Sequence, residues 1–320
     1  MTTPKFTTES VAIRYLIGEV LIGTRNLRLA VRKSHFSNES LFGSSLCDGW
    51  SELPSDADGF LFPSHLVQHR LRRLSFSNGR VQYVPVQTKR YYIDLTTSFD
   101  EYMQKFSAKS RSTLRRKLRS FEKLSDGKVD WRTFRGPTAI QEFYRLASPL
   151  SATTYQERLL NGGLPNTDAF KTNMLDLADR DEVVGYLLFL NSVPVAYLYT
   201  PLQNGIFKYQ FLGYDSSISK YSPGTVLQYL VLEELFSDAS YKMFDFTEGE
   251  GGQKAFFGTG HVDCADIYIL RRTLKNVLTV VTHLSLDRFS ESIVTLLDSI
   301  GLKSRLKKYF RANWSSTKRR

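Results

Sequence analysis

Apolar and polar residues alternate near the start of the chain, and the spacing becomes helical further on. The alternation over residues 11–33 predicts a β-hairpin with its turn near Asn26. Ser64 is a good helix-capping residue, and the residues from there to 73 are expected to form a short helix. Over residues 98–124 apolar residues recur every three or four positions while Arg and Lys fill the other face, which predicts an amphipathic helix.

The rest of the pattern mixes helices with strands that come mostly in consecutive pairs. It predicts helices at residues 138–147, 167–179, 223–236 and 253–257, and strands at residues 129–134, 183–190, 193–200, 206–214, 242–246 and 265–271. Antiparallel hairpins followed by one crossover helix favour an α+β fold over a doubly wound parallel sheet. We expect three regions: an N-terminal α/β region at 1–98, the main domain at 99–272 and a basic tail of amphipathic helices at 273–320.

Positive charge is concentrated in two runs of this 320-residue chain, whose formal net charge is +11. Eight Lys or Arg face one Glu between Lys105 and Lys123, and eight Lys or Arg occur without an acid between Leu302 and Arg320. Such runs either contact phosphate groups, anionic lipid or nucleic acid, or form solvated helix faces.

Cysteine content and hydropathy indicate the compartment. Cys47 and Cys264 offer neither a disulfide framework nor metal-ligand spacing, and the scattered histidines have no carboxylate at ligand spacing, so we expect no metal. The first ten residues lack a signal-peptide pattern, and no apolar run reaches the roughly 18 residues of a spanning helix. We expect a cytoplasmic protein that touches membranes at most from the surface, peripherally at their inner face.

The segment 221–225 opens a predicted helix directly after an aromatic strand. Ser222 is a good N-cap, Pro223 suits the first helical position, and Gly224 leaves the backbone uncovered. The free N–H groups and the helix dipole predict a cradle for a diphosphate or carboxylate, although an ordinary capped helix has the same pattern. The candidate cofactor-binding residues are Tyr221, Ser222, Gly224, Thr225 and Gly213, the last at the end of the preceding strand.

A glycine-rich turn after residue 246 carries the candidate catalytic groups. Glu248 and Glu250 are candidate general bases, and Lys254 is a candidate to hold a carbonyl oxygen or an oxyanion. A solvated acidic loop is the alternative. Tyr209 is a further candidate proton donor that core packing explains equally well, and Asp245 inside an apolar strand requires a hydrogen-bonding partner.

The basic helix carries two arginines four residues apart. Arg111 and Arg115 therefore share one face and are candidates to clamp a substrate or lipid phosphate.

Taken together, these residues resemble the GNAT superfamily, and within it the cellulose-biosynthesis acetyltransferase-like (CelD/BcsL-type) branch, a relative of the FemAB-like transferases. The resemblance covers about residues 99–272. It rests on Ser110-Arg111, Leu114-Arg115-Arg116-Lys117, Gly213-Tyr214-Asp215, Tyr221-Ser222-Pro223-Gly224 and Phe244-Asp245-Phe246 with Gly249, Glu250 and Lys254. The Gln/Arg-x-x-Gly-x-Gly/Ala signature of standard GNAT enzymes is absent between Asp215 and Val226.

This resemblance implies a GNAT acyltransferase fold with a mixed, mostly antiparallel central sheet flanked by helices, and an N-terminal region that is an abbreviated GNAT-like half. It implies that residues 222–225 meet the diphosphate of acetyl-CoA or another acyl-CoA, and that Glu250 and Lys254 belong to the reaction cleft. In the FemAB-like relatives a lysine at the comparable place steadies the acyl-transfer intermediate, a role that would fall to Lys254.

Three functions follow from these features. The first is transfer of an acyl group, with acetyl the expected group, from acyl-CoA to an amine or hydroxyl of a sugar, polysaccharide or envelope precursor. The second is a FemAB-like aminoacyl transfer from tRNA, with the basic helix contacting the nucleic acid. The third is a non-catalytic component of an exopolysaccharide synthesis complex that binds an anionic membrane surface through residues 273–320.

Overall fold

The computed structural model describes residues 6–18, 20–32, 50–153 and 163–299. Contacts divide the chain into unit 1, residues 1–88 with 263–320, and unit 2, residues 89–262. The boundaries between these units fall after residues 88 and 262, whereas the sequence-based boundaries fall after residues 98 and 272. The predicted three-region division stays a prediction. The basic run 302–320, the part of the predicted helical tail that directly precedes it, Cys47 and His35 lie outside the described residues.

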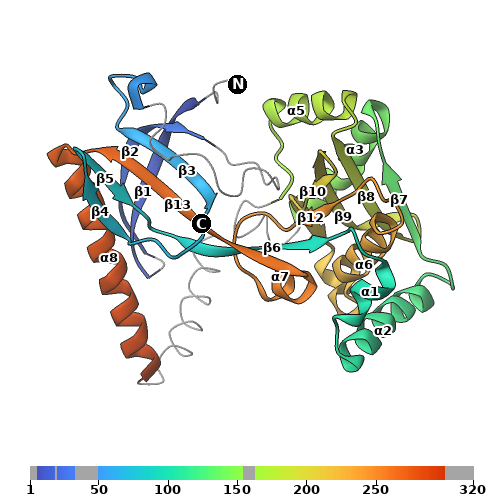
Figure 1. Cartoon of the computed structure of the whole chain (residues 1–320). Helices are drawn as coiled ribbons and strands as arrows, with labels where there is room; N and C mark the ends of the chain where they lie inside the picture. The colour runs from blue at the N-terminus through green and yellow to red at the C-terminus, as the bar shows by residue number, and fades with distance from the viewer. Residues whose placement is uncertain (1–5, 19, 33–49, 154–162, 300–320) are drawn as a thin grey trace, which may run out of the picture. The chain divides into compact units, whose positions relative to one another are not determined.

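Unit 1 is a mostly antiparallel sheet with one long helix. Its elements are β1 (Thr7–Ile17), β2 (Val20–Val31), the short 3₁₀ helix η1 (Trp50–Glu52), β3 (Gly59–Leu66), β4 (Leu74–Ser77), β5 (Arg80–Tyr83), most of β13 (Gly260–Arg271) and α8 (Leu274–Ser299). The strand order is β1-β2-β3-β13-β5-β4, and among these described strands only β2 and β3 are parallel. Figure 1 shows α8 lying along this sheet beside β1.

Both faces of the unit 1 sheet are apolar. On one face Val280 and Leu284 of α8 pack against strand residues such as Leu27, Leu29 and Val81. The other face has its own cluster, built around Phe60, Phe62, Ile267 and Ile269. Because β13 lies between β3 and β5, it contributes to both clusters.

Two expectations for unit 1 are wrong. The first hairpin turns at Gly18, and Asn26 lies inside β2 opposite Ala12. The segment predicted to be a helix from Ser64 begins inside β3, where Ser64 has a φ of 46° and donates its N–H to Asp266 at 2.7 Å. Pairing with β13, distant in the sequence, overrides the local capping pattern.

Unit 2 has a sheet with helices on both faces. It begins with β6 (Gln87–Asp94), α1 (Phe99–Gln104), α2 (Ala108–Leu124), β7 (Asp130–Phe134), α3 (Pro137–Thr153), α5 (Asp168–Asp179), β8 (Val183–Leu190) and β9 (Val193–Gln203). It continues with β10 (Ile206–Lys208), β11 (Phe211–Tyr214), the 3₁₀ helix η2 (Ser216–Tyr221), α6 (Pro223–Leu235), β12 (Met243–Asp245) and α7 (Gly252–Phe257). The order is β7-β8-β9-β10-β12-β6, with β11 also paired to β9.

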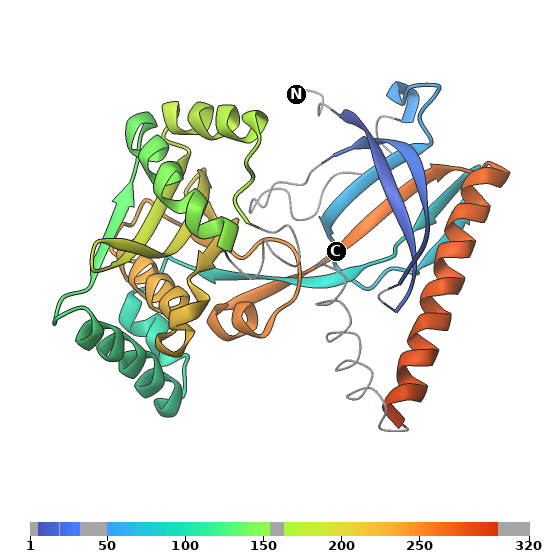
Figure 2. The same cartoon turned by 180° about the vertical axis from the view of Figure 1, so that it is seen from behind.

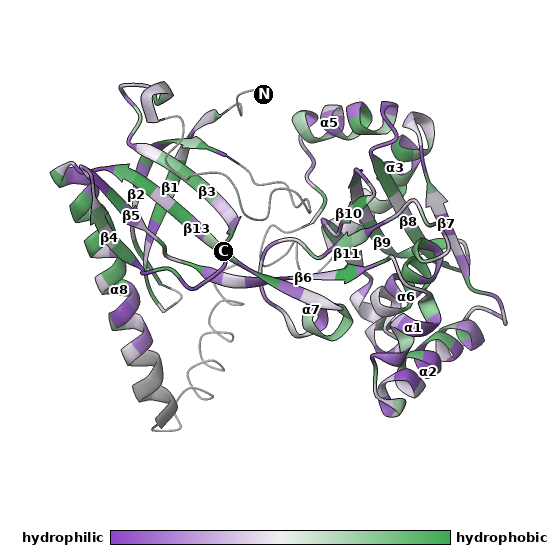
Figure 3. Cartoon of the chain, viewed as in Figure 1, coloured by the Kyte–Doolittle hydropathy of each residue, from purple (hydrophilic) through white to green (hydrophobic). Residues whose placement is uncertain are grey.

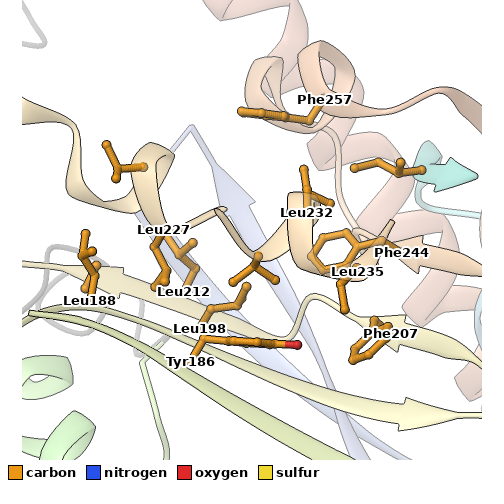
Figure 4. Close-up of a cluster of buried hydrophobic side chains, with 14 of the residues drawn as sticks. Tyr186, Leu188, Leu198, Phe207, Leu212, Leu227, Leu232, Leu235, Phe244 and Phe257 are labelled. Carbon is orange, nitrogen blue, oxygen red and sulfur yellow. The ribbon is translucent and has the colours of Figure 1, made fainter. Parts of the chain in front are cut away.

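Two hydrophobic clusters hold the helices of unit 2 against the sheet. Helices α3 and α5 cover one face, and α1, α2, α6 and α7 cover the other, as Figures 1 and 2 show from opposite sides. Figure 4 shows part of the cluster on the face covered by α1, α2, α6 and α7. There Leu227, Leu232 and Leu235 of α6 pack on side chains of β8 to β12. The buried strands β8 and β9 are green along most of their length in Figure 3.

The predicted fold class is confirmed. The only parallel pair within the unit 2 sheet, as far as the structure describes it, is β10 with β12. Of the expected C-terminal helices, α8 is described. In the described part of the chain, no helix combines the length and apolarity needed to span a membrane.

Candidate functional site

The parallel pair β10–β12 separates at one end, and this gap defines the candidate site. Pairing ends at Lys208 and Asp245, and the next N–H, of Tyr209, donates to the carbonyl of Asp245 at 2.8 Å. The following N–H, of Gln210, donates instead to Tyr199 of β9 at 3.3 Å. From there β11 pairs with β9 alone among the described strands.

A buried ion pair lies at the end of β12, where the two strands separate. Asp245 is fully buried and accepts hydrogen bonds from Arg90 of β6, one of them at 2.9 Å between Nε and Oδ1. The Arg90 side chain is itself 5% exposed. Burying a charge pair is tolerated only where each partner is satisfied, so this pair fixes the end of β12 against β6.

The backbone turns sharply just after the ion pair. Thr247 has a φ of 59°, which is unfavourable for a β-branched residue. Two hydrogen bonds hold it there: its N–H donates to Asp245 Oδ1 at 2.9 Å, and its hydroxyl donates to the carbonyl of Tyr209 at 3.2 Å. The acidic turn therefore leaves the sheet in a fixed direction.

The predicted catalytic groups of this turn make separate contacts, and of the two glutamates Glu248 is the one whose contact with Lys254 is seen. Lys254 of α7 donates from Nζ to the carbonyl of Glu248 at 2.5 Å, and Glu250 Oε1 accepts the N–H of Lys89 at 2.7 Å. The side chains of Glu248 and Glu250 are exposed. Burial lowers the pKa of Lys254, while the nearby Glu248 and Asp245 act in the opposite direction.

Arg90, Lys208 and Thr247 belong to the same cluster and are absent from the sequence-based set. Burial lowers the pKa of Lys208, which faces Asp245, Arg90 and Glu248. A charged residue inside an apolar strand is the available sequence signal, because such a residue requires a partner. That criterion singles out Asp245 but not Arg90, because Arg90 lies in the polar first half of β6.

Tyr209 lies at the break between β10 and β11 and packs against aromatic rings. Its ring centroid is 5.9 Å from that of Phe244 and 5.4 Å from that of Phe246. Burial raises the pKa of its hydroxyl, which keeps the group protonated. Its proton-donor role stays a prediction.

The predicted cradle at the start of α6 has a packing explanation for both glycines. A Cβ on Gly224 would lie 3.1 Å from Tyr214 and 3.2 Å from Leu212, so glycine permits the close approach of α6 to β11. A Cβ on Gly213 would lie 2.4 Å from the ring of Tyr197, its cross-strand neighbour. Neither glycine therefore requires a ligand to account for it.

The N-cap of α6 differs from the sequence-based expectation. Ser222 has a φ of 55° and makes no side-chain capping bond, and Tyr221 ends the preceding 3₁₀ helix. The carbonyl of Ser222 accepts the N–H groups of Thr225 and Val226 at 2.9 and 3.0 Å.

A pocket of about 400 Å³ lies between α2, the first turn of α6 and α7. Its lining residues are Lys109, Ser110, Thr113, Leu114, Lys117, Thr225, Gln253, Phe256 and Phe257. Two lysines and three hydroxyls give it the chemistry to hold an anion. Helix α7 thus contributes Gln253, Phe256 and Phe257 to the pocket and places Lys254 against the acidic turn.

The predicted arginine pair does not line this pocket. Arg111 is half-buried and donates to the carbonyl of Phe106 at 2.9 Å, near the end of α1. Arg115 is exposed on α2. The cations of the pocket are Lys109 and Lys117, on the same helix.

Lys105 connects α1 to the end of α7. Its Nζ donates to the carbonyl of Phe256 at 2.8 Å and to that of Gly258. It also lies 4.7 Å from the centre of the Phe106 ring. Lys105 therefore holds the end of α7, the helix that carries Lys254 and one wall of the pocket.

No group of three metal-ligating side chains occurs in the described ranges.

Comparison with known proteins agrees with this architecture. Residues 108–255 match the family described as "Acetyltransferase (GNAT) domain". No curated protein sequence matches the chain. The solved structure of FemX is similar over 86% of this chain and 90% of its own, with 13% identity and a TM-score of 0.50, which shows a shared fold. The structure of L-PGS from Bacillus licheniformis is 14% identical over 70% of this chain and 72% of its own, with a TM-score of 0.44.

Proposed function

We propose that unit 2 transfers an acyl group from acyl-CoA to an amine or hydroxyl of a sugar or cell-envelope precursor. The observation that carries this proposal is the pocket lined by Lys109 and Lys117 of α2 and by Thr225 in the first turn of α6. The pocket would take the phosphates of the donor, because lysine ammonium groups and a helix start both attract anions. The pantetheine arm would then follow β11.

The reaction proposed is direct attack on the thioester. The acceptor nitrogen or oxygen forms a bond to the acyl carbon, the carbon–sulfur bond breaks, and the acceptor's proton passes through a carboxylate or water to the departing CoA thiolate. Glu250 or Glu248 would receive that proton, and the ammonium of Lys254 would stabilise the oxyanion. Arg90 and Asp245 would hold the turn that carries these groups.

Titration calorimetry with acetyl-CoA and longer acyl-CoAs tests the donor. We expect micromolar binding that weakens at least tenfold in Lys117→Glu and in Lys109→Glu. The matched control is Arg116→Glu, which reverses an exposed charge on the same helix outside the pocket. Absence of binding by the folded wild type, or equal loss in the control, would contradict the proposal.

A second candidate donor is aminoacyl-tRNA. It is favoured by a row of exposed cations on α2 that do not line the pocket: Arg115, Arg116 and Arg119. Purple positions follow α2 in Figure 3. Under this alternative the Arg116→Glu variant loses tRNA binding, and the affinity falls steeply with salt as phosphate contacts require.

The acceptor class proposed would bring the protein to the cytoplasmic face of a membrane.

A further inference from the structure

The turn of the first hairpin in unit 1 is apolar and exposed. Turns are usually built from Gly, Asn, Asp, Ser and Pro. Here the turn at Gly18 is flanked by four aliphatic side chains whose exposure ranges from 39% to 57%: Leu16, Val20, Leu21 and Ile22. Between Leu16 and Ile22 the sequence has one charged residue, Glu19, which lies outside the described residues.

Hydrogen bonds to α8 hold the hairpin end in place. The N–H of Gly18 donates to Ser290 Oγ of α8 at 2.7 Å, and the Tyr15 hydroxyl donates to the carbonyl of Thr279 at 3.4 Å. Further from the turn, Ile13 and Leu27 are buried against α8. The exposed aliphatic groups are thus presented on a supported element.

We propose that this hairpin tip inserts into the interfacial region of an anionic lipid bilayer. The four side chains amount to an apolar surface on the order of a few hundred Å². A stable interface with a second copy needs about 800 Å² from each partner, so a membrane is the better fit. A small apolar protrusion can enter a bilayer without a complementary shape on the other side.

The charges behind the tip match the depth of a bilayer interface. Arg14 lies two residues from Leu16, about 7 Å along a strand that rises about 3.4 Å per residue. Arg25 lies three residues beyond Ile22 on the partner strand. Both arginines are exposed, and the ion pairs of the described residues do not include them. Apolar groups of interfacial segments enter about 5–10 Å, which would bring these guanidinium groups to the lipid phosphates.

Co-sedimentation of the full chain with vesicles tests the proposal. We expect binding to vesicles of phosphatidylglycerol and phosphatidylcholine in equal parts, and weak binding to phosphatidylcholine alone. The double variant Leu21→Glu with Ile22→Glu should bind at least tenfold more weakly. The matched control is Val193→Glu at the first position of β9 in unit 2, where the side chain is 60% exposed, and it should bind as the wild type does. Circular dichroism checks that each variant is folded.

A second variant reports on the tip itself. Indole fluorescence of Leu21→Trp, corrected for the wild-type signal, should shift to the blue with anionic vesicles and be quenched by lipids brominated near the headgroup. An unshifted spectrum would show that other segments hold the protein on the vesicles, and it would overturn the proposal. The same holds if the wild type binds no vesicles, or if light scattering finds a dimer that the double variant dissociates.

Discussion

Replacing Arg90 by Met tests whether the ion pair at the base of the gap holds unit 2 together. The change keeps the volume of the side chain but removes the guanidinium that donates to both oxygens of Asp245. Because the carboxylate is fully buried, it then remains in the interior without this partner. Breaking a buried pair in this way costs about 3–5 kcal/mol. That is a large share of the about 5–15 kcal/mol by which domains are stable.

The assay is urea unfolding followed by far-ultraviolet circular dichroism. Two variants give the comparison. The double variant Arg90→Met with Asp245→Leu removes both charges and should recover at least half of the loss, because no buried charge is left unpaired. Arg180→Met breaks an exposed pair with Glu182, in which the side chains are 56% and 36% exposed, and should cost about 0–1 kcal/mol. A loss below about 1 kcal/mol in Arg90→Met, or no recovery in the double variant, would refute the reasoning.

Three further predictions concern the helices and strands around the site. Gly213→Ala brings a Cβ to 2.4 Å from the Tyr197 ring and should cost about 1–3 kcal/mol in thermal unfolding, whereas Gly252→Ala, with nothing within 4 Å, should change little. Lys105→Met removes two hydrogen bonds to carbonyls at the end of α7, and should cost about 1 kcal/mol and lower kcat more than it raises KM for the donor; an unchanged kcat would count against a positioning role. Burial lowers the pKa of Lys254, so its charge is lost below the pH at which a free lysine deprotonates. The rate should therefore begin to fall at a lower pH in the wild type than in Lys254→Arg. If the two rates fall at the same pH, Lys254 does not take part in the reaction.

Local patterns predicted most of unit 2. The Asn191-Ser192 turn between β8 and β9 is correct, and both residues have the positive φ that such a turn requires. Uninterrupted apolar strands and a Pro at the first position of α6 also carry their structure in the local sequence. These elements need no information from elsewhere in the chain.

The errors lie where distant contacts decide. Ser64 resembles a helix cap, yet its N–H is bound by Asp266, about two hundred residues away. A second error has a local cause: the turn at Gly18 is flanked by aliphatic residues, which are typical of a strand, whereas the polar Asn26 is typical of a turn. Sequence rules identify turns by their polar residues, so they miss a turn flanked by apolar residues. The same apolar turn is the basis of the membrane proposal.

The candidate site was predicted only as far as its turn. Glu248, Glu250 and Lys254 follow from glycine spacing; in the structure Lys254 contacts the backbone carbonyl of Glu248, Glu250 contacts the backbone of Lys89, and the catalytic roles stay predictions. Arg90, the partner of Asp245, lies on a strand more than 150 residues earlier in the sequence. The pocket is lined by Lys109 and Lys117, on a face of α2 that does not include Arg111. Which face of a basic helix meets a ligand depends on packing that spacing alone does not reveal.

Unit 1 is assembled from both ends of the described chain, and this affects how it is made on the ribosome. Strand β13 lies between β3 and β5, but the whole of unit 2 is translated before it. At about 5–20 residues per second, β3 waits on the order of 10–40 s for its neighbour. During that time its edge and the faces it shares with β13 are open to other chains, while unit 2 has its full sequence available sooner. Chaperone capture during synthesis should therefore concentrate on the first 88 residues.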